Sequence, residues 1–328
     1  MTKMMKALMW TGPLQAEVRD EPVPEVAENH VLLRVAAAGI CGSDLHGYRG
    51  HSPVRTPPLI LGHEVVALDE AGRAFVVNPL ISCGECRLCR NGEPNLCPAR
   101  GLLGLDRPGA FAEYVSVPSR NLIPLPSGMS PLLGTLVEPL ATPMNALRST
   151  QLDANSVVVV LGAGPIGLLA AYAARERGVC LVASVEINPE RAEVAGLFAD
   201  VVGSDSAAVR VAVDEASGGL GADLVIDAVG IEATWTAACG LARSGGVIAE
   251  VGLTQGTGQM AVGDLVRRGL TLRGVYAYTE EDFRRAFDLL RESPPPLDWV
   301  ARAELNSGPK TLSDLVDGTG PIKVVFEL

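Results

Sequence analysis

The chain has 328 residues, of which 48% are hydrophobic, and its formal net charge is -11. This length favours two domains with a core each, and the acidic excess argues against a nucleic-acid partner, because phosphate backbones are bound through clustered lysine and arginine. No apolar run reaches the ~20 residues that a membrane span needs, and the N-terminal apolar stretch is too short for a secretory signal. A cytoplasmic protein without a membrane partner is therefore expected.

The first part of the chain alternates short apolar runs with glycine and proline turns, as in residues 31–38, 75–79 and 111–117. This alternation is typical of an all-β module. The hydrophobic pattern then changes. Residues 157–161 have the β-branched run that is typical of a buried parallel strand, and residues 166–178 have helical spacing. A βαβ unit is expected to begin here.

Strands and helices continue to alternate after this unit, which predicts a doubly wound parallel sheet. A further helix is expected at residues 280–291, and the apolar stretch 322–328 predicts a last strand that returns to the first domain. The sequence thus predicts an α/β protein with a β-rich domain of residues 1–148 and 279–328 and a dinucleotide-binding domain of residues 149–278. The expected strands of the second domain also include 181–186, 223–229, 247–251 and 270–276, and its further helices are 189–198 and 234–241.

A G-x-G-x-x-G pattern, Gly162, Gly164 and Gly167, follows the predicted strand directly. The glycines allow a tight turn and a close approach to a pyrophosphate, and the helix N-terminus supplies free N–H groups. Glu186 closes the second strand, where an acid binds the ribose hydroxyls and repels a 2′-phosphate. NAD is therefore favoured over NADP, although Arg191 leaves some tolerance for a phosphate. The motif also contains Pro165 and Ile166 as predicted cofactor-binding residues.

Four of the seven cysteines lie within residues 83–97 with the spacing C-x2-C-x2-C-x7-C. In a reducing compartment such a cluster favours a metal over disulfides, and four thiolates suit tetrahedral zinc with no open position. A structural zinc is therefore predicted, with an iron–sulfur cluster or free thiols as alternatives. Cys180 and Cys239 are expected to be inert. The predicted ligands of the structural zinc are Cys83, Cys86, Cys89 and Cys97.

A second candidate metal site is scattered along the chain and comprises Cys41, His63, Glu64 and Glu138. Each residue alone is weak evidence, because a lone cysteine or histidine is usually structural. A set of thiolate, imidazole and carboxylate ligands, however, leaves zinc an open position for water or an alkoxide. Together these residues predict a catalytic zinc.

The chain resembles the zinc-containing medium-chain dehydrogenases, in particular their polyol, secondary-alcohol and threonine dehydrogenase branch. The resemblance implies a GroES-like β-rich catalytic domain, a Rossmann domain and an active site in the cleft between them. It implies that Cys41, His63 and Glu138 bind catalytic zinc, with Glu64 as an exchangeable ligand or a neighbour of the metal. The stretch from Glu64 to Cys83 is shorter than usual for the family, which would trim a turn of the β-barrel or alter the cleft rim or the oligomer contact. The motifs that carry the resemblance are residues 39–46, 62–64, 83–97, 138–141, 162–167 and 221–230.

The resemblance also implies a proton relay. Ser43 would take the proton of the substrate hydroxyl and pass it through the ribose to His46 near the surface. Asp44 would orient His63 through its second ring nitrogen. The positions implied at the cofactor are Thr142 near the nicotinamide, Val229 and Val251 beside it, and Lys323 at the pyrophosphate.

These observations predict an oxidoreductase that binds two zinc ions per subunit and transfers a hydride from a polyol or secondary alcohol to NAD. Bound zinc would lower the pKa of the alcohol, so that the alkoxide forms near neutral pH. The alternatives are threonine 3-dehydrogenase-like oxidation of an amino alcohol, a lyase or epimerase that returns the hydride, and a non-catalytic redox sensor. A homodimer or homotetramer is expected, because the strand at 270–276 would end the sheet at an exposed edge.

Overall fold

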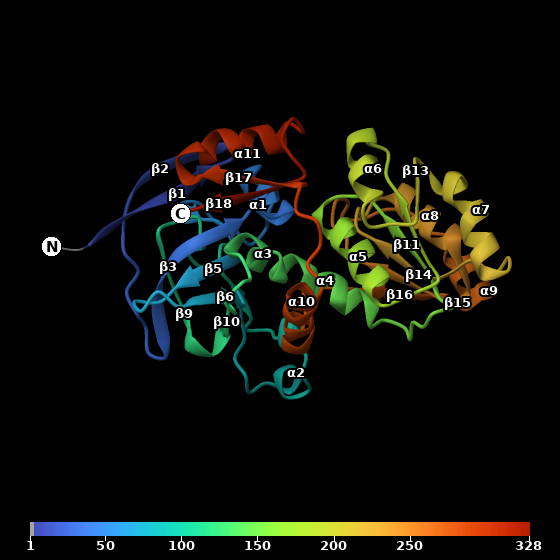
Figure 1. The fold of residues 1–328 in the computed structure, drawn as a ribbon, viewed down its shortest axis with the longest axis horizontal. Coiled ribbons are helices and arrows are strands. Elements are labelled where there is room, and N and C mark those ends of the chain that lie inside the picture. Colours follow the sequence, from blue (N-terminus) through green and yellow to red (C-terminus); the bar gives the residue numbers. More distant parts are fainter. Residues whose placement is uncertain (1–2) are drawn as a thin grey trace. The chain divides into compact units, whose positions relative to one another are not determined.

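The computed structural model describes residues 3–328, which fold as two compact units. Unit 1 comprises the chain up to Pro139 together with Leu290–Leu328, and unit 2 comprises Leu140–Leu289 (Figure 1). Both limits fall inside helices, α4 (Val137–Leu147) and α10 (Glu280–Glu292). The limits predicted at residues 148 and 279 therefore stay a prediction.

The largest sheet of unit 1 has the strand order β10-β6-β5-β3-β18-β17, and β9 also pairs with β3. A three-stranded sheet, β2-β1-β4, and a two-stranded sheet, β7-β8, complete the β-structure of this unit. The C-terminal strand β18 pairs antiparallel with β3, so the end of the chain adds to strands from its beginning. The strands are β1 (Met4–Gly12), β2 (Gln15–Pro22), β3 (His30–Gly39), β4 (Leu59–Ile60), β5 (Glu64–Leu68), β6 (Ala74–Val77), β7 (Leu80–Ile81), β8 (Gly101–Leu102), β9 (Tyr114–Pro118), β10 (Leu122–Pro124), β17 (Val300–Glu304) and β18 (Lys323–Glu327).

The core of unit 1 forms from the inward side chains of these strands, since successive residues of a strand point to opposite faces. Phe111 and Phe326 pack edge to face in this core, with ring centroids 5.1 Å apart. Gly62 precedes His63 with a φ of +95°, and a methyl group there would lie 2.4 Å from the ring of Phe111. Only glycine lets the chain pass this ring, which fixes the position of His63.

Unit 1 also contains short helices that the β-rich pattern did not predict. The most relevant is α1 (Gly42–Tyr48), which begins after Cys41. The carboxylate of Asp44 accepts a hydrogen bond from the Cys41 N–H at 3.1 Å and closes the first turn. The other helices are α2 (Arg87–Arg90), α3 (Pro131–Thr135) and α11 (Gly308–Val316), with 3-10 turns at Pro94–Leu96, Ser119–Asn121 and Leu305–Ser307.

The short stretch after Glu64 is a tight hairpin between β5 and β6. The Asp69 carboxylate accepts hydrogen bonds from the N–H groups of Ala71 and Arg73, at 3.0 and 2.8 Å. It also pairs with the Arg73 guanidinium at 2.7 Å, and Gly72 supplies the left-handed conformation with a φ of +75°. The hairpin is thus closed by its own residues.

Unit 2 is a six-stranded parallel sheet of order β13-β12-β11-β14-β15-β16. All five side chains of β11 are buried, as expected for a central strand covered on both faces. The predicted doubly wound fold is confirmed, and β16 is an edge strand. The elements are β11 (Val157–Leu161), α5 (Pro165–Glu176), β12 (Leu181–Val185), α6 (Pro189–Ala195), β13 (Val201–Gly203), α7 (Ser206–Ser217), β14 (Ala222–Asp227), α8 (Glu232–Leu241), β15 (Ala242–Glu250), α9 (Val262–Arg268) and β16 (Thr271–Gly274).

Candidate active site

The four clustered cysteines of unit 1 bring their sulfur atoms within 4.8 Å of one another. The Sγ atom of Cys83 lies 3.5 Å from that of Cys97 and 3.9 Å from that of Cys89, and Cys86 and Cys89 are 3.5 Å apart. Tetrahedral zinc with Zn–S bonds of 2.3 Å requires sulfurs about 3.8 Å apart. The spacing of the thiols therefore fits the predicted structural zinc.

The backbone of the cysteine loop also favours a thiolate at Cys83, whereas burial and the neighbouring cysteines raise the pKa of Cys86 to about 11. The N–H groups of Cys86 and Cys89 donate to the sulfurs of Cys83 and Cys86 at 3.4 and 3.5 Å. The backbone N–H groups of Glu85 and Cys86 lower the pKa of Cys83 to about 6. Most residues of this loop are exposed or half-buried. A bound metal would therefore stabilise this loop, which has few buried side chains of its own.

A second cluster of unit 1 gathers three predicted site residues around one imidazole. His63 is 3% exposed, and its ring contacts the thiol of Cys41. The hydroxyl oxygen of Ser43 lies 3.5 Å from Nε2 of the same ring. The N-terminal end of α1 therefore faces the residue that precedes β5, although the two segments are separated in sequence.

Asp44 lies on the other side of the imidazole, as the resemblance implied. Its Oδ1 atom is 3.4 Å from Nδ1 of His63, which is a charge contact and not a hydrogen bond, since Nδ1 is buried without a hydrogen-bond partner within residues 3–328. Burial disfavours charge on both groups, yet the Asp44 carboxylate and the Cys41 thiol raise the pKa of His63 well above its usual range. The His63 ring and the Arg55 guanidinium correspondingly lower the pKa of Asp44 despite its burial. Groups that attract a proton to this ring would also attract a metal cation.

Glu64 is fully buried, and its Oε2 atom forms an ion pair with Lys323. The Lys323 ammonium also donates to the carbonyl of Ile40 at 2.9 Å. The predicted contact of Lys323 with a pyrophosphate does not agree with this placement, because the ammonium is buried inside unit 1 and already paired. Strand order explains the pair, since β18, β3 and β5 are neighbours. The Oε1 atom of Glu64 is buried without a hydrogen-bond partner within residues 3–328, so one oxygen is left for a cation.

Glu138 lies in the first turn of α4 and is 8% exposed. Within residues 3–328, only the four clustered cysteines bring three or more possible ligand atoms within 4.8 Å of one another. Cys41 thus contacts His63, and Glu138 and Glu64 lie at the starts of α4 and β5. Their roles at a catalytic zinc stay predictions.

The glycine motif of unit 2 has the geometry of a close approach. Gly162 has a φ of +91°, and a methyl group there would lie 2.5 Å from Cγ2 of Val229. A methyl group at Gly167 would lie 1.8 Å from the Gly162 carbonyl oxygen, whereas one at Gly164 would meet nothing within 4 Å. Gly164 is also the residue that caps α5, followed by Pro165. The space beside the first N–H groups of α5 is thus open, which suits a phosphate.

Glu186 follows β12 and is held by two backbone groups. Its carboxylate accepts hydrogen bonds from the N–H groups of Ala163 and Asn188, at 2.7 and 2.8 Å. The acid is thereby fixed beside the glycine turn, where the sequence placed it. Arg191 is exposed on α6. Ile166 lies in the first turn of α5. Three other residues predicted to bind the cofactor are half-buried: Thr142 on α4, Val229 after β14 and Val251 after β15.

Two acidic residues of unit 2 that the sequence did not single out lie side by side at the ends of neighbouring strands, Asp227 on β14 and Glu250 on β15. Asp227 accepts hydrogen bonds from the N–H groups of Val229 and Gly230 at 2.9 and 3.0 Å. Burial and the charge of Asp227 raise the pKa of Glu250 to about 7. Their positions at the carboxyl ends of parallel strands were the signal that could have found them.

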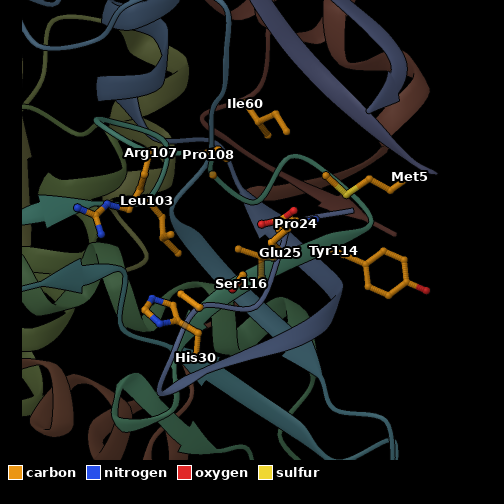
Figure 2. A pocket seen from close by; sticks show the side chains of 13 residues that line it. Met5, Pro24, Glu25, His30, Ile60, Leu103, Arg107, Pro108, Tyr114 and Ser116 are labelled. Atoms are coloured by element: carbon orange, nitrogen blue, oxygen red, sulfur yellow. The ribbon is translucent and has the colours of Figure 1, made fainter. Parts of the chain in front are cut away.

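Unit 1 also contains a cavity of about 350 Å³ away from these clusters. Apolar side chains line most of it, and its titratable members are Glu25, His30, Arg107 and Tyr114 (Figure 2). None of the predicted site residues lines this cavity. Tyr48, the last residue of α1, is buried and donates its hydroxyl to the Leu14 carbonyl at 3.0 Å.

Residues 27–127 match the family model of the alcohol dehydrogenase GroES-like domain, and residues 165–292 match that of the zinc-binding dehydrogenase. The chain is 30% identical to L-galactonate-5-dehydrogenase of Escherichia coli K12 over 90% of both chains. It is 32% identical to sorbitol dehydrogenase of Halalkalibacterium halodurans, covering 88% of this chain and 89% of the relative.

A solved structure with a similar fold is an alcohol dehydrogenase (RspB) of Escherichia coli CFT073 in complex with NADH. It is 26% identical, with a TM-score of 0.90 and 99% of both chains covered. These matches join both units of this chain to one family of oxidoreductases, for which zinc and NAD are the typical cofactors. The chain belongs to the zinc-binding, medium-chain alcohol dehydrogenase family.

Proposed function

We propose that this dehydrogenase oxidises a secondary hydroxyl group of a polyol or a related sugar acid and transfers the hydride to NAD. The observation that supports it most is the cluster around His63. Cys41 and Ser43 approach the imidazole on one side and Asp44 lies on the other. A thiolate, an imidazole and a nearby hydroxyl are what a metal-assisted alcohol oxidation needs.

Cys41, His63 and Glu138 would hold a catalytic zinc, and Glu64 would be a buried neighbour of it. A zinc ion held there would supply Lewis-acid stabilisation of the negative charge that develops on the substrate oxygen. Asp44 holds the orientation of His63, which keeps the ring ready as a ligand.

Ser43 accepts the proton of the substrate hydroxyl, and His46, three residues along the chain, carries it toward solvent. Burial, together with the charges of Arg49, His51 and Arg55, lowers the pKa of His46. The ring is therefore neutral near pH 7 and ready to accept a proton. This direction of transfer suits alcohol oxidation.

The substrate class rests on the relatives. Proteins named for L-galactonate and sorbitol match most of the chain, and both names denote chains of adjacent hydroxyl groups. A polyol or sugar acid is therefore the first choice.

The cofactor is NAD rather than NADP. Glu186 is fixed beside the glycine turn by two backbone N–H groups, and its charge would repel a 2′-phosphate there. Thr142, Val229 and Val251 would lie at the nicotinamide, and Arg191 would allow weak use of NADP.

We also propose that the enzyme works in the cytoplasm as a homodimer or homotetramer. The edge strand β16 supports an oligomer, because its backbone groups are open on one side and three of its four residues are exposed. Within residues 3–328, no helix has the length and apolar character to cross a membrane.

The test is NADH formation across a panel of polyols, sugar acids, secondary alcohols and threonine, with zinc measured on the same sample. A polyol or sugar acid is expected to give the highest kcat/KM. Preference for threonine would instead support amino-alcohol oxidation. Product formation without free NADH would indicate a lyase or epimerase, and NAD binding without turnover would indicate a sensor.

A further inference from the structure

We propose that Arg55 is a positioning residue of the active site, which holds Ser43 and Asp44 in the geometry that their functions require. The proposal rests on the proposed function above. Arg55 precedes β4 and belongs to none of the motifs that the sequence singled out.

The guanidinium of Arg55 joins the two residues that follow Gly42 in α1. Its Nη1 atom donates to the Ser43 carbonyl at 2.8 Å, and its Nη2 atom donates to the Ser43 hydroxyl at 3.3 Å. The same Nη2 atom pairs with Oδ1 of Asp44 at 3.3 Å, and Nε donates to the Gly104 carbonyl at 2.8 Å. All three guanidinium nitrogens are therefore used by the protein.

The surrounding backbone is shaped for this side chain. The Arg55 side chain is 2% exposed, and a buried guanidinium persists only where it is paired and hydrogen-bonded. A methyl group at Gly47 would lie 2.6 Å from Cδ of Arg55. Glycine at this position of α1 thus leaves the space that the arginine fills.

The contact with Ser43 would set the direction of proton transfer. A hydroxyl group has one hydrogen and two lone pairs. If Arg55 occupies one lone pair, the other remains to accept the substrate proton, and the hydroxyl hydrogen must point onward along the relay. Free rotation of the Ser43 hydroxyl would be lost, which favours a productive alignment.

The contact with Asp44 would act on His63. Asp44 is fully buried and touches both the His63 ring and the guanidinium. The positive charge of Arg55 compensates the buried carboxylate, and the planar fork fixes its orientation. Asp44 can then hold the imidazole without carrying an unpaired charge.

A double-mutant cycle tests the contact with Ser43. Arg55→Met is expected to lower kcat roughly 30-fold, with the substrate KM changed less than about threefold, and Ser43→Ala about 100-fold. Because Arg55 acts through Ser43, the double variant should lie within about threefold of Ser43→Ala alone. If the two losses multiply, Arg55 acts independently of Ser43 and the proposal is wrong.

A second measurement needs no activity. Zinc transfer to a colorimetric chelator should show a phase that is missing in Cys41→Ser, and this phase should be about tenfold faster in Arg55→Met because His63 is held less firmly. An unchanged rate would overturn the link through Asp44. The proposal stands only if both results are obtained.

Two further variants keep the test decisive. Arg73→Met removes an exposed Arg–Asp pair of the same unit and should change neither kcat nor zinc release. If Arg55→Met does not fold, Arg55→Lys replaces it in both measurements under the same criteria, since lysine keeps the charge but cannot make the forked contacts. If the wild-type enzyme oxidised no compound of the panel, the proposed function would be wrong. The rate of zinc release would still test the role of Arg55 in that case.

Discussion

The two candidate metal sites of unit 1 are built in opposite ways. The four clustered cysteines come from one short loop between β7 and β8, and their sulfurs lie within 4.8 Å of one another. The cluster around His63 joins α1, the turn before β5 and the segment of Arg55, and its central groups are almost fully buried. The first site is local and open to solvent, whereas the second depends on the pairing of distant strands.

This difference indicates what each site contributes. The cysteine loop has few buried side chains, so a metal there would replace a core and contribute mainly to stability. The His63 cluster lies inside an existing core, where Phe111 and Gly62 already fix the chain. A metal there would contribute mainly to chemistry.

The largest expected effect is on activity, in Cys41→Ser. We expect a loss of more than about 100-fold in kcat/KM, because even groups that only orient ligands often contribute 10- to 100-fold. The circular dichroism spectrum and melting temperature should change little. If this variant turned over substrate at the wild-type rate, the buried cluster would have no catalytic role, and the contrast between a catalytic and a structural site would be wrong.

Asp44→Asn should have the next largest effect. The amide keeps the shape of the side chain but loses the charge that faces His63 and Arg55. We expect catalytic zinc affinity to fall roughly 10- to 100-fold, measured by chelator titration. Affinity equal to that of the wild type would mean that Asp44 does not hold the ring.

Cys89→Ser should affect stability instead of chemistry. We expect the melting temperature to fall on the order of 5–10 °C and the protein to bind one zinc fewer, with kcat retained at low temperature. Calorimetry and metal analysis provide the measurement. An unchanged melting temperature would argue against a structural metal in the loop.

The smallest expected effect concerns Glu250 in unit 2, which contrasts with Asp44. Ion pairs lower the pKa of buried Asp44, whereas burial and Asp227 raise the pKa of Glu250 to about 7 from its ordinary value of 4.5. Between these two pH values the folded protein holds a proton at Glu250 that the unfolded chain has released. The contribution of Glu250 to the free energy of unfolding is therefore full below about pH 4.5 and is lost as pH rises through about 7.

The variant Glu250→Gln removes this dependence. Its melting temperature relative to the wild type should therefore rise by about 2 °C or more between about pH 5 and pH 8.5. A constant difference across this range would show that Glu250 does not titrate there. Glu186→Gln, whose carboxylate is held by backbone N–H groups, provides a control at another acid of unit 2.

The sequence predicted most of unit 2, because hydrophobic runs and the glycine motif report local structure directly. The strand predicted at residues 157–161 coincides with β11. Helices α7 and α9 were not predicted. In unit 1 the helices α1 and α3 were also missed, since each is short and the surrounding pattern is that of strands.

The sequence by itself determined the cluster of four cysteines, the glycine turn and the place of Glu186, because each depends on spacing along a short segment or on the end of a predictable strand. Only the tertiary structure decided that Lys323 pairs with Glu64 and that Arg55 reaches Ser43 and Asp44. These contacts follow from which strands become neighbours and from the space that Gly47 leaves open. Such long-range pairings leave no periodic signal in one sequence, because the free energy that selects them comes from packing and charge compensation between distant segments.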